Sequence, residues 1–331
     1  MRLLAADKTT LALPESPCLW KCFGAHKGQQ GLGAIAVELC CLFDLISRAP
    51  LFFVYGKACT SEHKLINKLI YTLKKNDLLL LDSGFYYCTT FSKILLRHAH
   101  FLIPAKKIFR PEVLSPLGQG DYLCQIKDYN EKTTLTVRVL FVHRNGFRRR
   151  RLVTSLLDPS LFPASELAQL YHMRWDIETF YRDFKHTMRA TSWHCHTSTS
   201  FHQELFVHMI TICLIRIAMF EASRLINVSV GQLSFARALT ETRLFLKLLL
   251  STAQRPLWFS LWKNLVQCCA THRVRFKPNR QFPRDRQEYR KKSRGLERRP
   301  IGRKPKYSAT TPPTPAPETL KDSKGITFLL S

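Results

Sequence analysis

Residues 60 to 107 alternate clearly between helix-like and strand-like patterns. A helix capped at Thr60 or Ser61 is predicted first, followed by the apolar strand "DLLLLD" and the turn "SGF". A second helix and the strand "FLIPA" complete the stretch. Helices that alternate with short apolar strands predict a layered α/β domain with a largely buried sheet.

The flanking patterns extend this α/β prediction. Residues 2–14, "RLLAADKTTLALP", predict a strand or a hairpin with Asp7 near its middle. The nearly all-apolar residues 34–46 fit a buried strand or a short helix, which periodicity does not separate. Two strand-like runs flank Asn145-Gly146, a strong hairpin signal. The predicted domains are a first part of the core at 1–107, a β-rich insertion at 108–157, the rest of the core with C-terminal helices at 158–272, and a tail at 273–331.

Helical patterns return after the insertion. Pro163 and Ser165 open a helix that leads into "YHMRWDIETFYRDFK" at 171–185, and further helices are expected over 201–226 and 231–268. Beside an apolar stripe, four chemically different side chains in the quoted stretch fall within an arc of roughly 60° on an α-helix. They are Tyr171, Arg174, Glu178 and Lys185, and the stripe is Leu170, Ile177, Tyr181, Phe184 and Met188. The alternative is a solvated surface on which Glu178 pairs with a neighbouring arginine, contributing a few tenths of a kcal/mol.

The charge of the chain favours a polyanionic partner. Its 51 Lys and Arg stand against 24 Asp and Glu, a formal charge of +27. Nucleic acid is the commonest partner of so basic a chain, although a merely basic surface is the alternative. Fifteen Lys and Arg against three acids make residues 273–306 a basic tail, and a Pro-rich segment follows at 310–318.

The cysteines and the apolar segments indicate a cytoplasmic protein without a membrane span. Eleven cysteines with no C-x-x-C pair are typical of reduced thiols, and neither Cys18 with Cys22 nor the "HCH" at 194–196 has a partner pair for zinc. No signal peptide is recognised at the start. The apolar run at 207–220 is short and contains Arg216, so we expect a buried helix there.

Three acidic residues stand where chemistry is plausible. Asp7 lies within the first strand, Asp82 closes "LLLLD", and Glu178 lies on the polar arc of the quoted helix. Converging carboxylates need a cation, and hard oxygen ligands select Mg²⁺ or Mn²⁺. Such a cluster suits phosphoryl transfer by two metal ions. The alternatives are a turn residue, a helix cap and half of a surface ion pair, respectively.

The chain resembles the DDE transposases of bacterial insertion sequences. "YHMRWDIETFYRDFK" fits the pattern Tyr-x2-Arg-x3-Glu-x6-Lys that defines one branch of that family, while "AADKTTLALPES" and "DLLLLDSGFY" are similar to its two aspartate blocks. The similarity extends from about residue 3 to about residue 300. Lys8 replaces a usual glycine, and Ser83 stands where a basic residue often occurs.

The resemblance implies a ribonuclease H-like core interrupted by a β-rich insertion and followed by a helical C-terminal region. It also implies cut-and-paste transposition, in which Mg²⁺ (or Mn²⁺) supports cleavage at transposon ends and strand transfer into target DNA. Asp7, Asp82 and Glu178 would hold the metal, while Tyr171, Arg174 and Lys185 would bind the DNA end. The implied partners are double-stranded DNA and a second copy in a synaptic homodimer, at the nucleoid of a bacterial cytoplasm.

The resemblance also makes two other functions worth separating from transposition. Family members usually carry a helical DNA-binding domain before the first aspartate, so an N-terminally truncated copy is expected here. A non-catalytic nucleic-acid-binding remnant would use only the basic tail. A metal-dependent nuclease would share the carboxylates but lack strand transfer.

Overall fold

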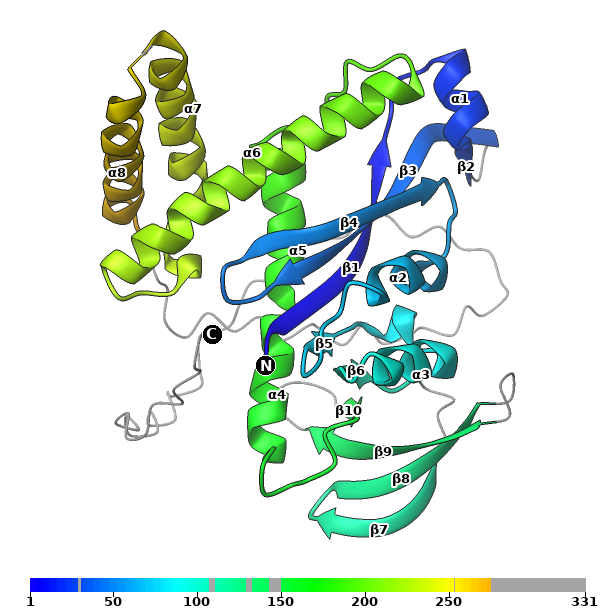
Figure 1. The fold of residues 1–331 in the computed structure, drawn as a ribbon. Helices are drawn as coiled ribbons and strands as arrows, with labels where there is room; N and C mark the ends of the chain where they lie inside the picture. The colour runs from blue at the N-terminus through cyan, green and yellow to red at the C-terminus, as the bar shows by residue number, and fades with distance from the viewer. Residues whose placement is uncertain (29–30, 107–110, 129–132, 143–149, 253, 275–331) are drawn as a thin grey trace, which may run out of the picture. The chain divides into compact units, whose positions relative to one another are not determined.

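The computed structural model describes residues 1–28, 31–106, 111–128, 133–142, 150–252 and 254–274, all within the unit Met1–Arg284. Within these ranges, ten strands form one sheet that has helices on both faces (Figure 1). The strands are β1 (Leu3–Ala12), β2 (Ala25–Gly28), β3 (Gly31–Asp44), β4 (Ala49–Lys57), β5 (Leu78–Leu80), β6 (His100–Pro104), β7 (Glu112–Gly118), β8 (Asp121–Asp128), β9 (Thr133–Val142) and β10 (Arg150–Thr154).

The helices follow the strands in two groups. The α-helices are α1 (Pro17–Phe23), α2 (Glu62–Ile70), α3 (Cys88–Leu96), α4 (Ala164–Met173), α5 (Trp175–Arg182), α6 (Ser198–Leu225), α7 (Phe235–Ser251) and α8 (Arg255–Thr271). The short turns are η1 (Ser83–Phe85) and η3 (Val230–Gln232), both 3₁₀, and η2 (Asp183–Thr187), which is π-helical. A mixed α/β chain with a large sheet is therefore confirmed.

The predicted alternation over 60–107 is confirmed element by element. Helix α2 begins after Ser61, whose hydroxyl accepts a hydrogen bond from the Lys64 amide, so the second of the two predicted caps is used. All three residues of β5 are buried, as expected for a strand paired in parallel on both sides, to β1 and β6. The two ambiguous stretches are also settled, because 2–14 contains the strand β1 and 34–46 lies mostly in β3.

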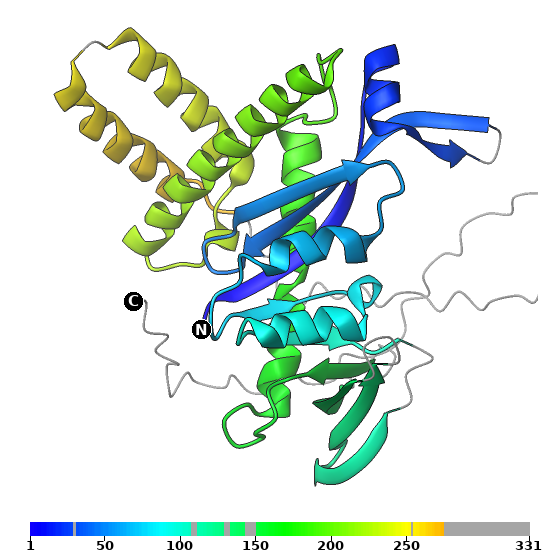
Figure 2. The ribbon, with the colours of Figure 1, turned by 45° about the vertical axis from the view of Figure 1, so that its right-hand side comes forward.

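Side chains of β1 alternate between two apolar layers. Leu4 and Ala6 pack with α2 and α3, while Leu3, Ala5 and Leu11 pack with α5 and α6. The two views agree that α2 and α3 cover one face of the sheet and α5 the other (Figures 1 and 2). Since Asp7 continues the odd-numbered series, its side chain belongs to the face covered by α5.

Strands β7 to β10 continue the same sheet rather than forming a separate one. The strand order is β2-β3-β1-β5-β6-β10-β9-β8-β7, with β4 on β3, and β10 pairs antiparallel with both β6 and β9. The β9–β10 pairing joins the two runs predicted as a hairpin, although the Asn145-Gly146 turn itself lies outside the described residues. The division of the chain at 107, 157 and 272 stays a prediction.

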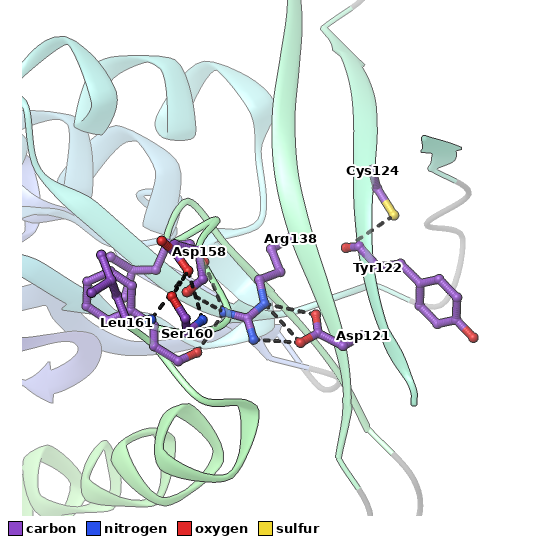
Figure 3. Close-up of polar contacts among 9 residues, drawn as sticks. Asp121, Tyr122, Cys124, Arg138, Asp158, Ser160 and Leu161 are labelled. Carbon is purple, nitrogen blue, oxygen red and sulfur yellow. Dashed lines mark hydrogen bonds and ion pairs between the residues drawn. The ribbon is translucent and has the colours of Figure 1, made fainter. Parts of the chain in front are cut away.

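Arg138 fastens these strands to the chain that enters α4. Its guanidinium is fully buried, and Nε and Nη2 donate to the carboxylate of Asp121 at 2.6 to 3.1 Å (Figure 3). Nη1 donates to the carbonyl oxygens of Leu156, Asp158 and Phe162. A buried charge is tolerated only when it is paired and hydrogen-bonded, as it is here. Arg138 thus fixes the loop that sets the start of α4.

The C-terminal helices differ in one respect from the sequence prediction. The helical stretch predicted over 231–268 is divided into α7 and α8, and Pro256 stands in the first turn of α8, where proline is tolerated. Helix α6 is long and apolar enough by composition to cross a membrane, but ten of its residues are buried in the core, and Arg216 within it forms an ion pair with Asp183 at 2.7 Å. It is the buried helix that was predicted.

From residue 275 on, the basic tail and the Pro-rich segment lie outside the described residues.

Candidate active site

Residues 171–185, which contain the Tyr-Arg-Glu-Lys motif, lie in one nearly continuous helical segment made of α4, α5 and the π turn η2. Arg174, between α4 and α5, keeps helical backbone angles of φ −52° and ψ −30°. Ile177, Phe180 and Phe184 are fully buried against the sheet. Apolar residues at these spacings fix which side of the segment faces the core.

Ion pairs outside the four-residue motif hold this segment in place. Asp176 pairs with Arg48, and Asp183 pairs with the buried Arg216 of α6. Desolvation on burial lowers the pKa of Arg216 to about 10 despite the partly opposing charge of Asp183. These pairs orient the opposite flank toward a cleft of about 580 Å³. The cleft is lined by Asp82, Ser83, Pro104, Ala105, Arg150, Arg151, Tyr171, Arg174, Trp175 and Glu178.

The sheet register places Asp7 beside Asp82. In the parallel pairing of β1 with β5, Leu3 lies opposite Leu78 and Ala5 opposite Leu80. Extending that register by two residues puts Asp7 level with Asp82, and adjacent strands lie about 4.8 Å apart. Asp82 also caps η1, because its Oδ1 accepts a hydrogen bond from the Gly84 amide at 2.7 Å. The predicted alternative of a cap is thus part of how this carboxylate is held.

Arg174 interacts with the carboxylates of both Asp7 and Glu178. Its Nη2 donates to Glu178 Oε1 at 2.7 Å, and its Nη1 lies 3.8 Å from Asp7 Oδ2. The i,i+4 pair of the alternative interpretation is therefore present, and it is partly buried: Arg174 is only 7% exposed, whereas the Glu178 side chain is 38% exposed. The guanidinium is a shared counter-ion that brings Asp7 and Glu178 to one place.

Burial of this arrangement raises the pKa of Asp7 to about 7. Desolvation is the largest cause; the Lys8 amide and Arg174 act against it, and the charges of Asp82 and Glu178 add to it. All three predicted carboxylates therefore interact electrostatically. A cation placed among them would relieve their repulsion.

Tyr171 lies in the cleft as part of the predicted polar face, whereas Lys185 lies elsewhere. The Tyr171 ring centroid is 6.0 Å from Arg174 Cζ, and burial raises the pKa of its hydroxyl to about 12. Lys185 does not line the cleft; its Nζ donates to the Thr10 carbonyl at 2.7 Å. The predicted 60° arc assumed an α-helix as far as Lys185, but η2 is π-helical and turns less per residue.

Five residues near the carboxylates escaped the sequence prediction. Ser83, Arg150, Arg151 and Trp175 line the cleft, and the carboxylate of Glu62 lies against Gly84, where an added Cβ would come within 1.9 Å of Oε2. Burial and then the charge of Asp82 raise the pKa of Glu62. The run of four arginines at 148–151 was an available signal, but it was interpreted only as part of a hairpin strand.

Comparison with known proteins supports the resemblance. The family model "Transposase DDE domain" matches residues 1–214. The chain belongs to the DDE transposase family. It is 30% identical over 253 residues to the transposase InsG of the insertion sequence element IS4 from Escherichia coli (strain K12), which covers 72% of this chain and 57% of the relative.

Two further matches to this chain are weaker. A probable transposase for the insertion sequence element IS5377 of Geobacillus stearothermophilus is 25% identical over 170 residues, covering 49% of this chain and 44% of the relative. The chain therefore spans about half the length of the two curated relatives described. A cryo-EM structure of the piggyBac transposase synaptic complex with hairpin DNA aligns at 10% identity with a TM-score of 0.44, over 84% of this chain and 59% of that chain.

The three predicted carboxylates of this chain fit a hard divalent cation. Asp7, Asp82 and Glu178 supply oxygen atoms only, and the charges of Asp82 and Glu178 add to the rise that desolvation causes in the pKa of Asp7. Over the described ranges, no three His, Cys, Asp or Glu side chains already stand in metal-binding geometry. Arg174 donates a hydrogen bond to one oxygen of Glu178, and the Gly84 amide donates one to an oxygen of Asp82.

The raised pKa of Asp7 predicts a pH dependence of stability without metal. Between pH 4 and pH 7 the folded chain keeps a proton on Asp7 that the unfolded chain has released, so this group makes the protein less stable as pH rises through that window. Differential scanning fluorimetry in EDTA should show a stabilisation by Asp7→Asn, relative to wild type, that is larger at pH 8 than at pH 5. An unchanged difference across that range contradicts the assignment.

Proposed function

We propose that this chain carries the catalytic core of a metal-dependent DNA transposase, which cleaves phosphodiester bonds at transposon ends and joins the freed ends to target DNA. One observation carries the proposal. Asp7 on β1 and Glu178 on α5 meet at the guanidinium of Arg174, and Asp82, level with Asp7 after the parallel strand β5, lines the same cleft as Arg174 and Glu178. Three separate elements thus deliver carboxylates to one place on a strongly basic chain.

The core is proposed to be ribonuclease H-like. Strand β3 pairs antiparallel with both β4 and β1, β5 and β6 follow in parallel, and α2 and α3 lie in the connections. This order supports a core to which the 108–157 insertion and the C-terminal helices are additions. The parallel connections place Asp82 at a strand end, where α/β proteins position reactive groups.

Each proposed site residue has a role that its chemistry suits. Asp7, Asp82 and Glu178 would hold Mg²⁺, or Mn²⁺ in its place, which when bound supplies an activated attacking oxygen and a stabilised leaving oxygen. Arg174 and Tyr171 line the cleft and would orient a phosphate and its neighbouring sugar or base. Lys185 is assigned to the DNA end by the sequence motif alone.

The partners follow from the same proposal. Double-stranded DNA, first as the transposon end and then as target, is the polyanion that a charge of +27 favours. A synaptic homodimer and a site of action on the bacterial nucleoid are part of the proposal.

Arg150 and Arg151 predict a measurable electrostatic contribution to DNA binding. Both lie on the β10 side of the cleft that holds Asp82 and Glu178. If each contacts one phosphate, replacing both with alanine should reduce the slope of log K against log salt by about 1.8, since each contact contributes about 0.9. Filter binding at several salt concentrations in EDTA measures this slope. The matched control is Arg237→Ala with Arg243→Ala on α7, which should leave the slope unchanged; equal slopes for both pairs contradict the prediction.

The proposed function is tested by strand transfer. Labelled duplexes ending at the inverted repeats that flank the gene are incubated with the protein, supercoiled plasmid and Mg²⁺ or Mn²⁺. Joining of labelled 3′ ends to plasmid, absent in EDTA and with Asp82→Asn, is expected. Cleavage without joining would support a nuclease instead, and binding without cleavage a non-catalytic remnant.

A further inference from the structure

The hydroxyl of Tyr181 makes a contact that the proposed mechanism has not used. Tyr181 lies on α5, is 6% exposed, and donates its hydroxyl proton to the carbonyl oxygen of Asp7 at 2.6 Å. The hydroxyl oxygen of Tyr181 in turn accepts a hydrogen bond from the amide of Cys41 at 3.1 Å. Asp7 and Cys41 lie directly opposite each other in the antiparallel pairing of β1 with β3. The helix is therefore hydrogen-bonded to the backbone of the residue that carries the first carboxylate.

The hydrogen bond from Tyr181 to Asp7 lies close to Glu178 as well. Glu178 precedes Tyr181 by three residues, which is about 4.5 Å along a helix axis. Any sliding or rotation of α5 at Tyr181 is transmitted to Glu178, because less than one helical turn separates them. Tyr181 thus links the backbone of Asp7 to the helical turn of Glu178.

Apolar packing would fix this relation less closely. Phe180 and Phe184 hold α5 on the sheet, but hydrophobic contact is non-directional, whereas a hydrogen bond depends on distance and angle. Burial of the phenol raises its pKa well above the ordinary value, so the hydroxyl keeps the proton that it donates. The hydrogen bond from Tyr181 to Asp7 is therefore kept across the pH range in which the carboxylates titrate.

We propose that Tyr181 is a positioning residue whose hydroxyl sets the distance between the carboxylates of Asp7 and Glu178, and through it the affinity of the site for a divalent cation. The inference rests on the proposed function, since it concerns the same metal ligands. Groups that orient metal ligands typically change metal affinity by about 10- to 100-fold when removed. Tyr181 itself contacts neither metal nor DNA in this assignment.

The test uses Tyr181→Phe, which removes the hydroxyl and keeps the ring. Unfolding temperature is followed during MnCl₂ titration of the whole chain, and the dependence of its increase on concentration gives a Kd. We expect Tyr181→Phe to raise the Kd for Mn²⁺ by about tenfold, while DNA affinity in EDTA is unchanged and saturating Mn²⁺ restores most of the cleavage rate. The matched control is Tyr55→Phe, which removes a hydroxyl that contacts His202 on α6 and should leave the Kd unchanged.

The outcomes separate this inference from the proposed function. If wild type shows no Mn²⁺-dependent shift that Asp82→Asn removes, the proposed metal site is wrong. If wild type shows that shift and Tyr181→Phe has the same Kd, the positioning role alone is overturned. Should Tyr181→Phe not fold, 4-aminophenylalanine at this position restores a donor: a wild-type Kd supports the role, and a tenfold weaker one overturns it.

Discussion

Replacing Glu178 with glutamine is expected to abolish DNA cleavage while leaving the fold and DNA binding intact. Glutamine keeps the size of the side chain but removes the charge that pairs with Arg174 and that would bind the cation. A loss of about 4 kcal/mol of transition-state stabilisation slows a reaction by about 10³-fold, and loss of a metal ligand should cost at least that much. Single-turnover nicking of plasmid DNA in Mg²⁺ measures the rate.

The control for this variant is on the preceding helix. Glu166 lies exposed in the first turn of α4 and does not line the cleft, so Glu166→Gln should cleave at the wild-type rate. Binding of both variants to DNA in EDTA should equal that of wild type. Nicking that persists in Glu178→Gln and in EDTA would show that the carboxylates are not the catalytic site.

The largest effect on stability is expected from Arg138. Arg138→Ala leaves the buried carboxylate of Asp121 without its cation and removes one donor from each of three carbonyl oxygens, and breaking a buried ion pair in this way typically costs about 3 to 5 kcal/mol. Urea unfolding measures the free energy of unfolding. Because Arg138 holds the loop before α4, the position of Tyr171 in the cleft should be disturbed as well.

Two variants make the Arg138 prediction specific. Arg237→Ala removes an exposed arginine from α7 and should change the free energy of unfolding by less than about 0.5 kcal/mol. Replacing Arg138 with Met and Asp121 with Leu together removes both charges, and apolar replacements of whole buried pairs are often close to neutral. If Arg138→Ala lowers the free energy of unfolding by less than about 1 kcal/mol, water replaces the guanidinium and the prediction is wrong.

Local patterns were enough to predict most of the elements near the site. The alternation over 60–107 predicted α2, β5, η1, α3 and β6, because capping residues, apolar runs and turns are encoded within a few residues. The same patterns put Asp7 in a strand and Asp82 after one. The π turn η2 was not predicted, since nothing in "DFKHT" distinguishes it from a continuing α-helix. Lys185, which lies in this turn, contacts Thr10 and does not line the cleft.

The sequence by itself determined the chemistry of this protein: its basic charge, its three candidate carboxylates and its family motif. Tertiary structure alone decided how these groups meet. Strand register, which local patterns do not encode, puts Asp7 level with Asp82. Long-range pairing brings Arg150 and Arg151 to the cleft, and burial makes Arg174 a shared counter-ion instead of a surface partner. Distances between residues that are remote in the chain depend on the packing of the whole sheet. The motif therefore identified the candidate residues, whereas the distances between them were decided by the fold.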